Sequence, residues 1–255
     1  PSSWTLPSMA SLFSSSYPAR HGFTDFDGEL AAVRAPGHLA EALCAAGFEC
    51  RAVVGNTLLA AERGFARGFA LYDAYDYALE GRLWLWRAAN RALRAAGILR
   101  SAKRELVPVL TARFPFVETR LTFYNLDEDV TARVLRYALP APADRPLFLY
   151  VHYLAPHAPY LEHPLTLAKR WHEPGEGDLD EQRRLYAGEV AYADGEIGRL
   201  LAHLERAGVL DGAVVCATAD HGEAFLEHGR LEHGYDLHRE ALRVPWLIAG
   251  PGLPA

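Results

Sequence analysis

The chain has 255 residues, of which half are apolar and 23% are charged, and its formal net charge is −6. This composition supplies enough apolar surface for a folded globular domain and excludes a chain that is disordered as a whole. The negative net charge excludes a global basic surface for nucleic acid. Three cysteines are too few for a disulfide scaffold. The sequence also contains no run of about 20 apolar residues, which a membrane-spanning helix would need.

The first part of the chain predicts two helices and a strand. Pro7 fits the first turn of a helix, where its missing N–H costs nothing, and this places Thr5 at or just before the helix N-terminus. Free N–H groups and the positive end of the helix dipole make that position a natural anion site, although Thr is also an ordinary N-cap. A second helix is expected at residues 37–46, and the apolar run 50–55 predicts a buried strand.

The segment 57–125 does not continue this pattern. We expect it to be a variable helical insertion within a single catalytic domain that spans residues 1–255. Between residues 82 and 104 it contains six Arg and one Lys and no acidic residue. Such a basic amphipathic helix can lie on an anionic membrane surface, and a solvated helix face within an inserted lid would have the same pattern.

The second half of the chain alternates helices with strands. Helices are expected at residues 127–139 and 181–207, and buried strands at 147–153, 213–218 and 244–249. Near-continuous apolar strands that alternate with helices predict an α/β fold, with a mostly parallel sheet sandwiched by helices.

Side chains capable of catalysis follow these strands. Asp220 and His221 come directly after the strand at 213–218, and open α/β sheets bind ligands at the carboxyl ends of their strands. This pair offers one oxygen and one nitrogen to a divalent cation, although a polar loop with a hydrogen-bonded His would have the same sequence. His157 follows the preceding strand and His233 lies further along the chain, and imidazoles can bind metal, donate to an oxyanion or act as general acids.

Taken in order, these blocks resemble the sulfatase family of the alkaline phosphatase superfamily. The matching blocks lie at residues 3–8, 17–22, 39–41, 45–48, 53–56, 148–160, 219–223, 227–229, 233–234 and 243–245. The resemblance implies an alkaline-phosphatase-like fold and a metal-dependent enzyme that acts on phosphoric or sulfuric ester bonds. The family's first strand, with its metal-binding acidic residues, would precede Pro1, so we expect this chain to lack that strand and to have an incomplete metal site.

The resemblance places the family's nucleophile on Thr5 and its late metal pair on Asp220 and His221, with the Thr5 oxygen as a further metal ligand. Formylglycine sulfatases have Cys or Ser at the first position of this signature and Arg at the last, whereas this chain has Thr5 and Met9. Thr nucleophiles occur in phosphoryl-transfer branches of the superfamily, so we expect attack on phosphorus and a phosphothreonine intermediate. Mixed oxygen and nitrogen ligands favour Zn²⁺ or Mn²⁺, with Ca²⁺ as an alternative.

Three further residues receive roles through the resemblance. His157 belongs to the family's Pro-His-x-Pro-Tyr signature, whose His contacts the anionic group of the substrate in relatives. Asn56 stands where many sulfatases have a substrate-contacting Lys. His233 stands near another such Lys, at a position that can protonate the leaving group.

Three alternative functions remain open. The first is a sulfuric ester hydrolase that uses an unmodified Thr. The second is a membrane-linked transferase of the phosphoethanolamine or glycerol-phosphate type, which the basic stretch 82–104 would suit, and the third is a catalytically inactive binding domain. The expected partner is a small-molecule, lipid or glycan ester and no nucleic acid. Membrane association is compatible with the basic stretch, and the relatives suggest a periplasmic, secreted or membrane-anchored location.

Overall fold

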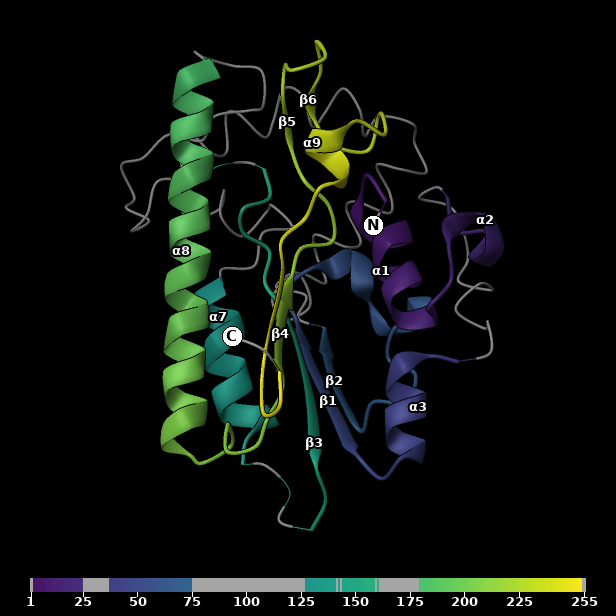
Figure 1. Cartoon of the computed structure of the whole chain (residues 1–255), viewed down its shortest axis with the longest axis vertical. Coiled ribbons are helices and arrows are strands. Elements are labelled where there is room, and N and C mark those ends of the chain that lie inside the picture. The colour runs from purple at the N-terminus through teal and green to yellow at the C-terminus, as the bar shows by residue number, and fades with distance from the viewer. Residues whose placement is uncertain are drawn as a thin grey trace, which may run out of the picture.

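Three parallel strands and the helices around them form the centre of the protein (Figure 1). The computed structural model describes residues 2–24, 37–74, 127–140, 142, 144–158, 160 and 179–253. The described helices are α1 (Thr5–Ser14), α2 (Pro18–His21), α3 (Leu39–Ala45), α7 (Asp127–Arg133), α8 (Leu179–Arg206) and α9 (Arg239–Leu242), with short 3₁₀ helices η2 (Thr57–Leu59) and η3 (Ala61–Arg63) and the π-helix η4 (Val134–Ala138). The described strands are β1 (Glu49–Val54), β2 (Leu71–Ala74), β3 (Leu147–His152), β4 (Val215–Thr218), β5 (Ala224–Phe225), β6 (Leu231–Glu232) and β7 (Trp246–Ala249).

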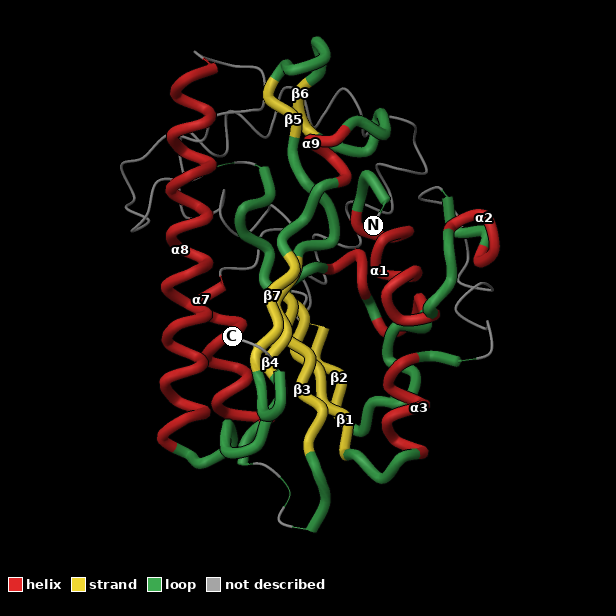
Figure 2. The backbone as a smooth tube through the Cα atoms, viewed as in Figure 1, coloured by secondary structure: helices red, strands yellow, loops and turns green. Residues whose placement is uncertain are grey.

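The central sheet has the order β2-β1-β3 and both pairs are parallel. Val53 of β1 lies opposite Asp73 of β2 on one side and opposite Val151 of β3 on the other. The strands predicted at 50–55 and 147–153 are therefore confirmed, and their carboxyl ends meet at one edge of the sheet (Figure 2).

Successive residues of β1 face different hydrophobic clusters. Ala52 and Val54 pack with residues of α1 such as Phe13, whereas Val53 packs with Val130 of α7 and with residues of α8. Both faces of the strand are thus covered by helices, which explains why β1 is apolar without the alternation of a half-exposed strand. The predicted α/β fold with helices on both faces of a mostly parallel sheet is confirmed.

The two long helical predictions in the second half are also confirmed. The helix α8 spans 28 residues and ends just before Gly208, whose φ of +68° suits a left-handed helix stop. The predicted helix 127–139 is present as α7, which continues into the π-helix η4. His38, at the start of α3, accepts a hydrogen bond from the Ala40 N–H and caps that helix.

The strands β4 and β7 depart from the expectation. They exist where the sequence predicts them, but they pair with each other in antiparallel fashion, with Cys216 opposite Ile248. Every residue of β7 is exposed, and the Trp246 side chain is 62% exposed. The strand at 213–218 is not buried either, since Cys216 is exposed. The predictions of buried strands at 213–218 and 244–249 are wrong for this structure, because within the described residues β4 and β7 have only each other as pairing partners. A second antiparallel pair, β5 and β6, lies above it.

The segment predicted as a helical insertion is described only up to residue 74. Its first part forms η2, η3 and the sheet strand β2, so residues 71–74 belong to the central sheet, which the sequence interpretation missed. The rest of the insertion, including the basic stretch 82–104, lies outside the described residues. Among the described helices, none is both long and apolar enough to cross a membrane.

Candidate active site

The candidate site lies where α1 begins and where β1, β3 and β4 end (Figure 2). Thr5 is the first residue of α1 and only 3% of it is exposed. Its Oγ1 atom lies 3.3 Å from the Nε2 atom of His221, and its hydroxyl donates a hydrogen bond to the Asp220 carboxylate. The first turn of the helix, with free backbone N–H groups and the positive end of the dipole, thus adjoins the predicted metal pair.

The hydrogen bonds of His221 fix which ring nitrogen has a free lone pair. Its Nδ1 atom lies 2.8 Å from the carbonyl oxygen of Gly222, which can only accept, so Nδ1 donates. In the neutral ring Nε2 then has no proton and directs its lone pair toward Thr5. This is the tautomer that a metal-binding imidazole requires.

Asp220 remains a carboxylate although it is partly buried. Burial raises the pKa of its carboxyl group, but the neighbouring His221 and His152 imidazoles and the hydrogen bond from Thr5 outweigh burial, so the pKa lies below its ordinary value. Its Oδ2 atom is 3.5 Å from Nε2 of His221. The Thr5 Oγ1 atom and the Asp220 Oδ2 atom therefore both lie within 3.5 Å of the same nitrogen, Nε2 of His221.

This donor set fits a divalent cation in part. Ligands about 2.1 Å from one tetrahedral ion lie about 3.4 Å from each other, and the separations of 3.3 Å and 3.5 Å among the three donors agree with that geometry. Within the described ranges, however, no three His, Cys, Asp or Glu side chains are arranged to hold a metal ion. Metal binding by Asp220, His221 and Thr5 therefore remains a prediction, which would need further ligands.

Two more histidines face this group from other segments. The His233 ring lies 4.0 Å from that of His221, and the His157 ring lies 5.1 Å from that of His233, measured between ring centroids. The Nδ1 atom of His157 is 2.5 Å from the carbonyl oxygen of Ala158 and donates to it. Burial, reinforced by the nearby His233, lowers the pKa of His157, so its ring tends to be neutral until an anion approaches.

His233 has the opposite tendency. Burial lowers its pKa, but Glu223, whose carboxylate lies 2.9 Å from Nδ1, outweighs burial and raises it overall. Glu223 also forms a side-chain hydrogen bond with Tyr160, which is 5% exposed. His233 is therefore oriented with Nδ1 toward Glu223 and with Nε2 free to hold a proton.

Asn56 follows β1 at the same edge of the sheet and is 6% exposed. Its Oδ1 atom accepts a hydrogen bond of 2.9 Å from the Leu58 N–H and so caps η2. None of the contacts recorded within the described residues joins Asn56 to Thr5 or His157. The structure thus gives it a capping role, and substrate contact remains a prediction.

Several residues of the site were not predicted from the sequence. Glu223 orients His233, and His152 lies close enough to Asp220 to lower the pKa of that carboxyl group. His152 in turn is 2.9 Å from the hydroxyl of Tyr150. Alternation along β3 could have indicated that Tyr150 and His152 share a face, whereas nothing in the spacing of Glu223 indicated its partner.

Gly222 is required by close packing behind Asp220 and His221. A Cβ atom at this position would lie 1.9 Å from the carbonyl oxygen of Glu240. The Gly222 N–H donates to the Ala241 carbonyl oxygen at 2.8 Å, which ties the loop bearing His221 to α9. Only a residue without a side chain allows this contact.

The fold and the site define a class of protein. A parallel sheet lies between helices. At the carboxyl ends of the strands, a hydroxyl at a helix N-terminus faces an Asp–His pair and two further histidines. This is the arrangement expected from the alkaline phosphatase superfamily.

The comparisons with known proteins define the family. The model of the family named Sulfatase matches residues 2–255, and the chain belongs to the sulfatase family of that superfamily. Among curated proteins, it is 33% identical over 78 residues to a choline-sulfatase of Rhizobium meliloti and 32% identical over 80 residues to arylsulfatase K of Bos taurus. Each match covers 31% of this chain and 15% of the relative.

Solved structures share the fold over nearly the whole chain. A phosphonate monoester hydrolase of Agrobacterium radiobacter superimposes with a TM-score of 0.62 at 18% identity, covering 96% of this chain and 58% of that one. A lipoteichoic acid synthase of Listeria monocytogenes superimposes with a TM-score of 0.54 at 14% identity, covering 98% of this chain and 54% of that one. The chain thus spans between half and two thirds of these neighbours.

Proposed function

We propose that the protein cleaves phosphate esters, with Thr5 as the nucleophile. The observation that supports this most directly is the position of the Thr5 hydroxyl, which contacts both Asp220 and His221 at the N-terminus of α1. A Thr hydroxyl is weakly nucleophilic by itself and needs such activation. An anionic phosphoryl group would also be stabilised by the positive end of the helix.

Asp220 and His221, together with the Thr5 oxygen, would hold a divalent cation such as Zn²⁺, Mn²⁺ or Ca²⁺. When bound, the cation would lower the pKa of the Thr5 hydroxyl and offset negative charge on the substrate. The lone pair that His221 directs toward Thr5 and the ionised state of Asp220 support this assignment.

The covalent step exchanges one ester bond for another. The deprotonated Thr5 oxygen forms a bond to phosphorus in line with the bond to the leaving oxygen, which breaks. His233 transfers its Nε2 proton to that leaving oxygen, and Glu223 stabilises the protonated ring before the transfer. Water or an acceptor alcohol then takes the phosphoryl group from Thr5.

His157 is proposed to hold the non-bridging oxygens of the substrate, with Asn56 as a second contact. The Nδ1 proton of His157 is committed to Ala158, so Nε2 donates to the substrate only when the ring is protonated. A bound dianion favours that protonation. Charge stabilisation of this kind is commonly the largest contribution to such catalysis.

A second candidate function is sulfate ester hydrolysis. The curated relatives over the matched 78–80 residues are named choline-sulfatase and arylsulfatase. Phosphoryl transfer to a glycan or lipid acceptor is a third, since a lipoteichoic acid synthase shares the fold. Thr5, where formylglycine sulfatases have Cys or Ser, favours the phosphate ester.

The test is an assay of the full-length protein with phosphate monoesters, phosphate diesters and sulfate esters, each with Zn²⁺, Mn²⁺ or Ca²⁺ after treatment with a chelator. We expect phosphate ester turnover that depends on metal, a loss of at least about 1000-fold in Thr5→Ala and partial retention in Thr5→Ser. Ser16→Ala, which removes a hydroxyl just beyond the other end of α1, serves as the matched control. Turnover of sulfate esters alone, or turnover indifferent to Thr5, would contradict the proposal.

A further inference from the structure

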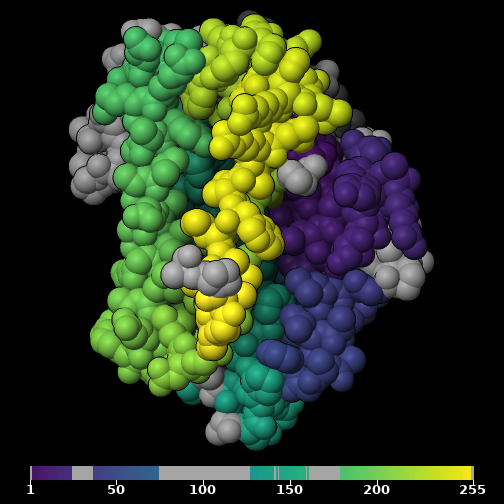
Figure 3. Space-filling model, viewed as in Figure 1, coloured from purple at the N-terminus to yellow at the C-terminus, as the bar shows by residue number. Residues whose placement is uncertain are grey.

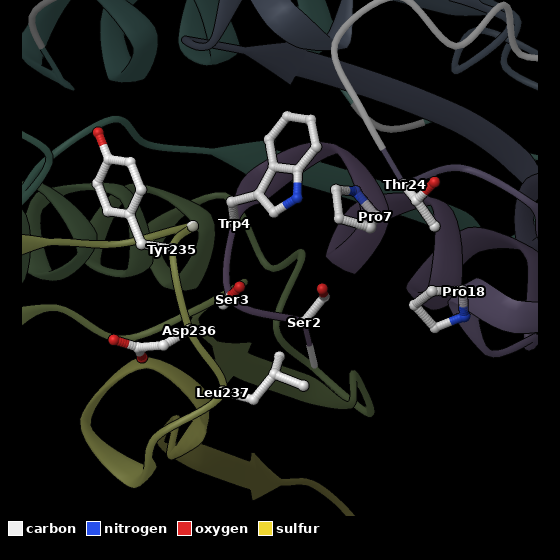
Figure 4. A pocket seen from close by; sticks show the side chains of 10 residues that line it. Ser2, Ser3, Trp4, Pro7, Pro18, Thr24, Tyr235, Asp236 and Leu237 are labelled. Carbon is white, nitrogen blue, oxygen red and sulfur yellow. The ribbon is translucent and has the colours of Figure 1, made fainter.

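A small pocket opens beside the candidate site and is bounded by the same two segments that present Thr5 and His233 (Figure 4). Trp4, which directly precedes Thr5, is among its lining residues. So is Tyr235, which stands two residues after His233. The two segments that bound the pocket therefore also carry the proposed nucleophile and the proposed general acid.

Gly234 brings the two segments together. It has a φ of +88°, and a Cβ atom built on it would lie 3.5 Å from the Cβ atom of Trp4. The backbone after His233 thus passes close to the Trp4 side chain, and both residues line the pocket or directly adjoin a residue that does.

The size and lining of the pocket restrict what it can hold. Its volume of about 240 Å³ is below the range of about 300–1,000 Å³ that is typical of drug-sized ligands, so it suits one ring or a group of similar size. Trp4, Tyr235 and Leu237 supply apolar surface, and Ser2 and Ser3 supply hydroxyl groups. In Figure 4 the Trp4, Ser2 and Ser3 side chains lie near one another, whereas the Tyr235 ring projects outward at the rim.

Charge restricts the ligand further. Among the described residues that line the pocket, Asp236 is the one with a charged side chain. One of its carboxylate oxygens accepts a hydrogen bond from the His238 N–H at 3.2 Å, so the group is held in place. The guanidinium of Arg230 lies over the Tyr235 ring at 5.9 Å and is not part of the lining. A second anionic group on the substrate would meet the Asp236 carboxylate here, whereas an ammonium group or a hydroxyl group could bind to it.

We propose that this pocket binds the alcohol part of the ester, and that it selects a ring-sized alcohol that is cationic or neutral over one that is anionic. The assignment rests on the proposed function, because it takes the leaving oxygen to lie on the His233 side. Trp4 and Tyr235 provide contact area for the ring, and Asp236 sets the order of preference by charge.

The experiment uses three phosphate esters that differ only in the charge of one ring substituent. They are the esters of 4-aminocyclohexanol, cyclohexanol and 4-hydroxycyclohexanecarboxylic acid. For the full-length protein we expect kcat/KM to fall in that order, with about a tenfold difference between the cationic and the anionic ester. In Asp236→Asn the difference should shrink to about twofold or less. Asp144→Asn, an exposed Asp outside the pocket, should keep the wild-type order.

A second pair of variants tests the aromatic wall. Tyr235→Leu should raise KM for all three esters by about threefold to tenfold without changing their order, and Tyr137→Leu, an exposed tyrosine on η4, should leave KM unchanged. If the order by charge is absent in the wild type, or is the same in Asp236→Asn, the proposal is overturned.

A binding measurement separates this proposal from the proposed function. In Thr5→Ala, the free alcohols are titrated by NMR, and 4-aminocyclohexanol should bind more tightly than 4-hydroxycyclohexanecarboxylate. Binding in that order without any ester turnover by the wild type would support the pocket and contradict the proposed function. Turnover with equal kcat/KM for all three esters would support the proposed function and overturn the pocket assignment.

Discussion

The candidate site joins two walls that are built in opposite ways. One wall, which presents Thr5, consists of α1 and the parallel sheet, and its strand β1 is covered on both faces. The other wall, which presents Asp220 and His221, extends from the antiparallel pair of β4 and β7, and every residue of β7 is exposed. Figure 3 shows the C-terminal segment on the surface between α8 and the N-terminal segment.

An apolar run in the sequence does not by itself determine whether the strand that it forms is buried. Residues 50–55 and 244–249 are both short and rich in apolar side chains. Helices cover the first run on both faces, whereas the second has β4 as its one pairing partner within the described residues. The proposed nucleophile therefore rests on a packed core, and the proposed metal pair is held by loop contacts such as that between Gly222 and Ala241.

The largest expected difference between the two walls concerns their aromatic side chains. Phe13 is 1% exposed and its ring lies 4.9 Å from that of His38, whereas Trp246 is 62% exposed. Phe13→Ala should lower the free energy of unfolding by about 3–5 kcal/mol, and Trp246→Ala by less than about 1 kcal/mol. Chemical denaturation measures both. A cost above about 2 kcal/mol for Trp246→Ala would mean that β7 is covered in the full-length protein and would break the comparison.

Asp127, in the packed wall, should make stability depend on pH. Its carboxyl group accepts a hydrogen bond from the Leu154 N–H at 2.7 Å, and burial raises its pKa from 3.8 to about 7. The Asp127 carboxyl group ionises near pH 3.8 in the unfolded chain, but only near pH 7 in the folded protein. Its contribution to the free energy of unfolding is therefore fully present below pH 4 and is lost as the pH rises to about 7. The loss would amount to about 4 kcal/mol at most.

Denaturation of Asp127→Asn between pH 4 and 8 tests this dependence. The variant should lack the part of the pH dependence that Asp127 causes, and its stability relative to the wild type should increase as the pH rises. Asp211→Asn, an exposed Asp before β4, serves as the matched control and should follow the wild-type profile. Parallel profiles for Asp127→Asn and the wild type would show that the carboxyl group ionises normally.

A smaller effect is expected at Gly222 in the exposed wall. Gly222→Ala brings a methyl group against the Glu240 carbonyl, so the loop must move, and we expect a cost of about 2–3 kcal/mol. Gly188 in α8 has nothing within 4 Å of a Cβ atom at its position, and Gly188→Ala should stabilise the protein by about 0.5–1 kcal/mol. Thermal denaturation of both variants checks the pair. Equal effects would mean that the loop is not held by α9.

The sequence predicts the fold better than it predicts the surroundings of the site. Apolar runs and helical periodicity locate β1, β3, β4, β7 and the helix α8, because these signals are local. The antiparallel pairing of β7 and the strand β2 were missed, because pairing partners depend on contacts that are distant in sequence.

The site shows the same division. The structure brings together five of the predicted site residues, Thr5, Asp220, His221, His157 and His233. The resemblance to sulfatases is confirmed at the level of the family. Their roles remain predictions. The orientation of His233 by Glu223 could not be read from the sequence, because it depends on the antiparallel pairing of β5 with β6, which brings the two residues together.

The central claim is that Thr5 becomes phosphorylated during turnover. The most direct measurement is to quench the full-length protein with acid while it turns over a phosphate ester, and to determine the mass of the peptide that contains Thr5. We expect an increase by the mass of one phosphoryl group, which disappears when the substrate is exhausted and is absent in Thr5→Ala. Turnover without any phosphorylated peptide, or a phosphoryl group on another residue, would contradict the account.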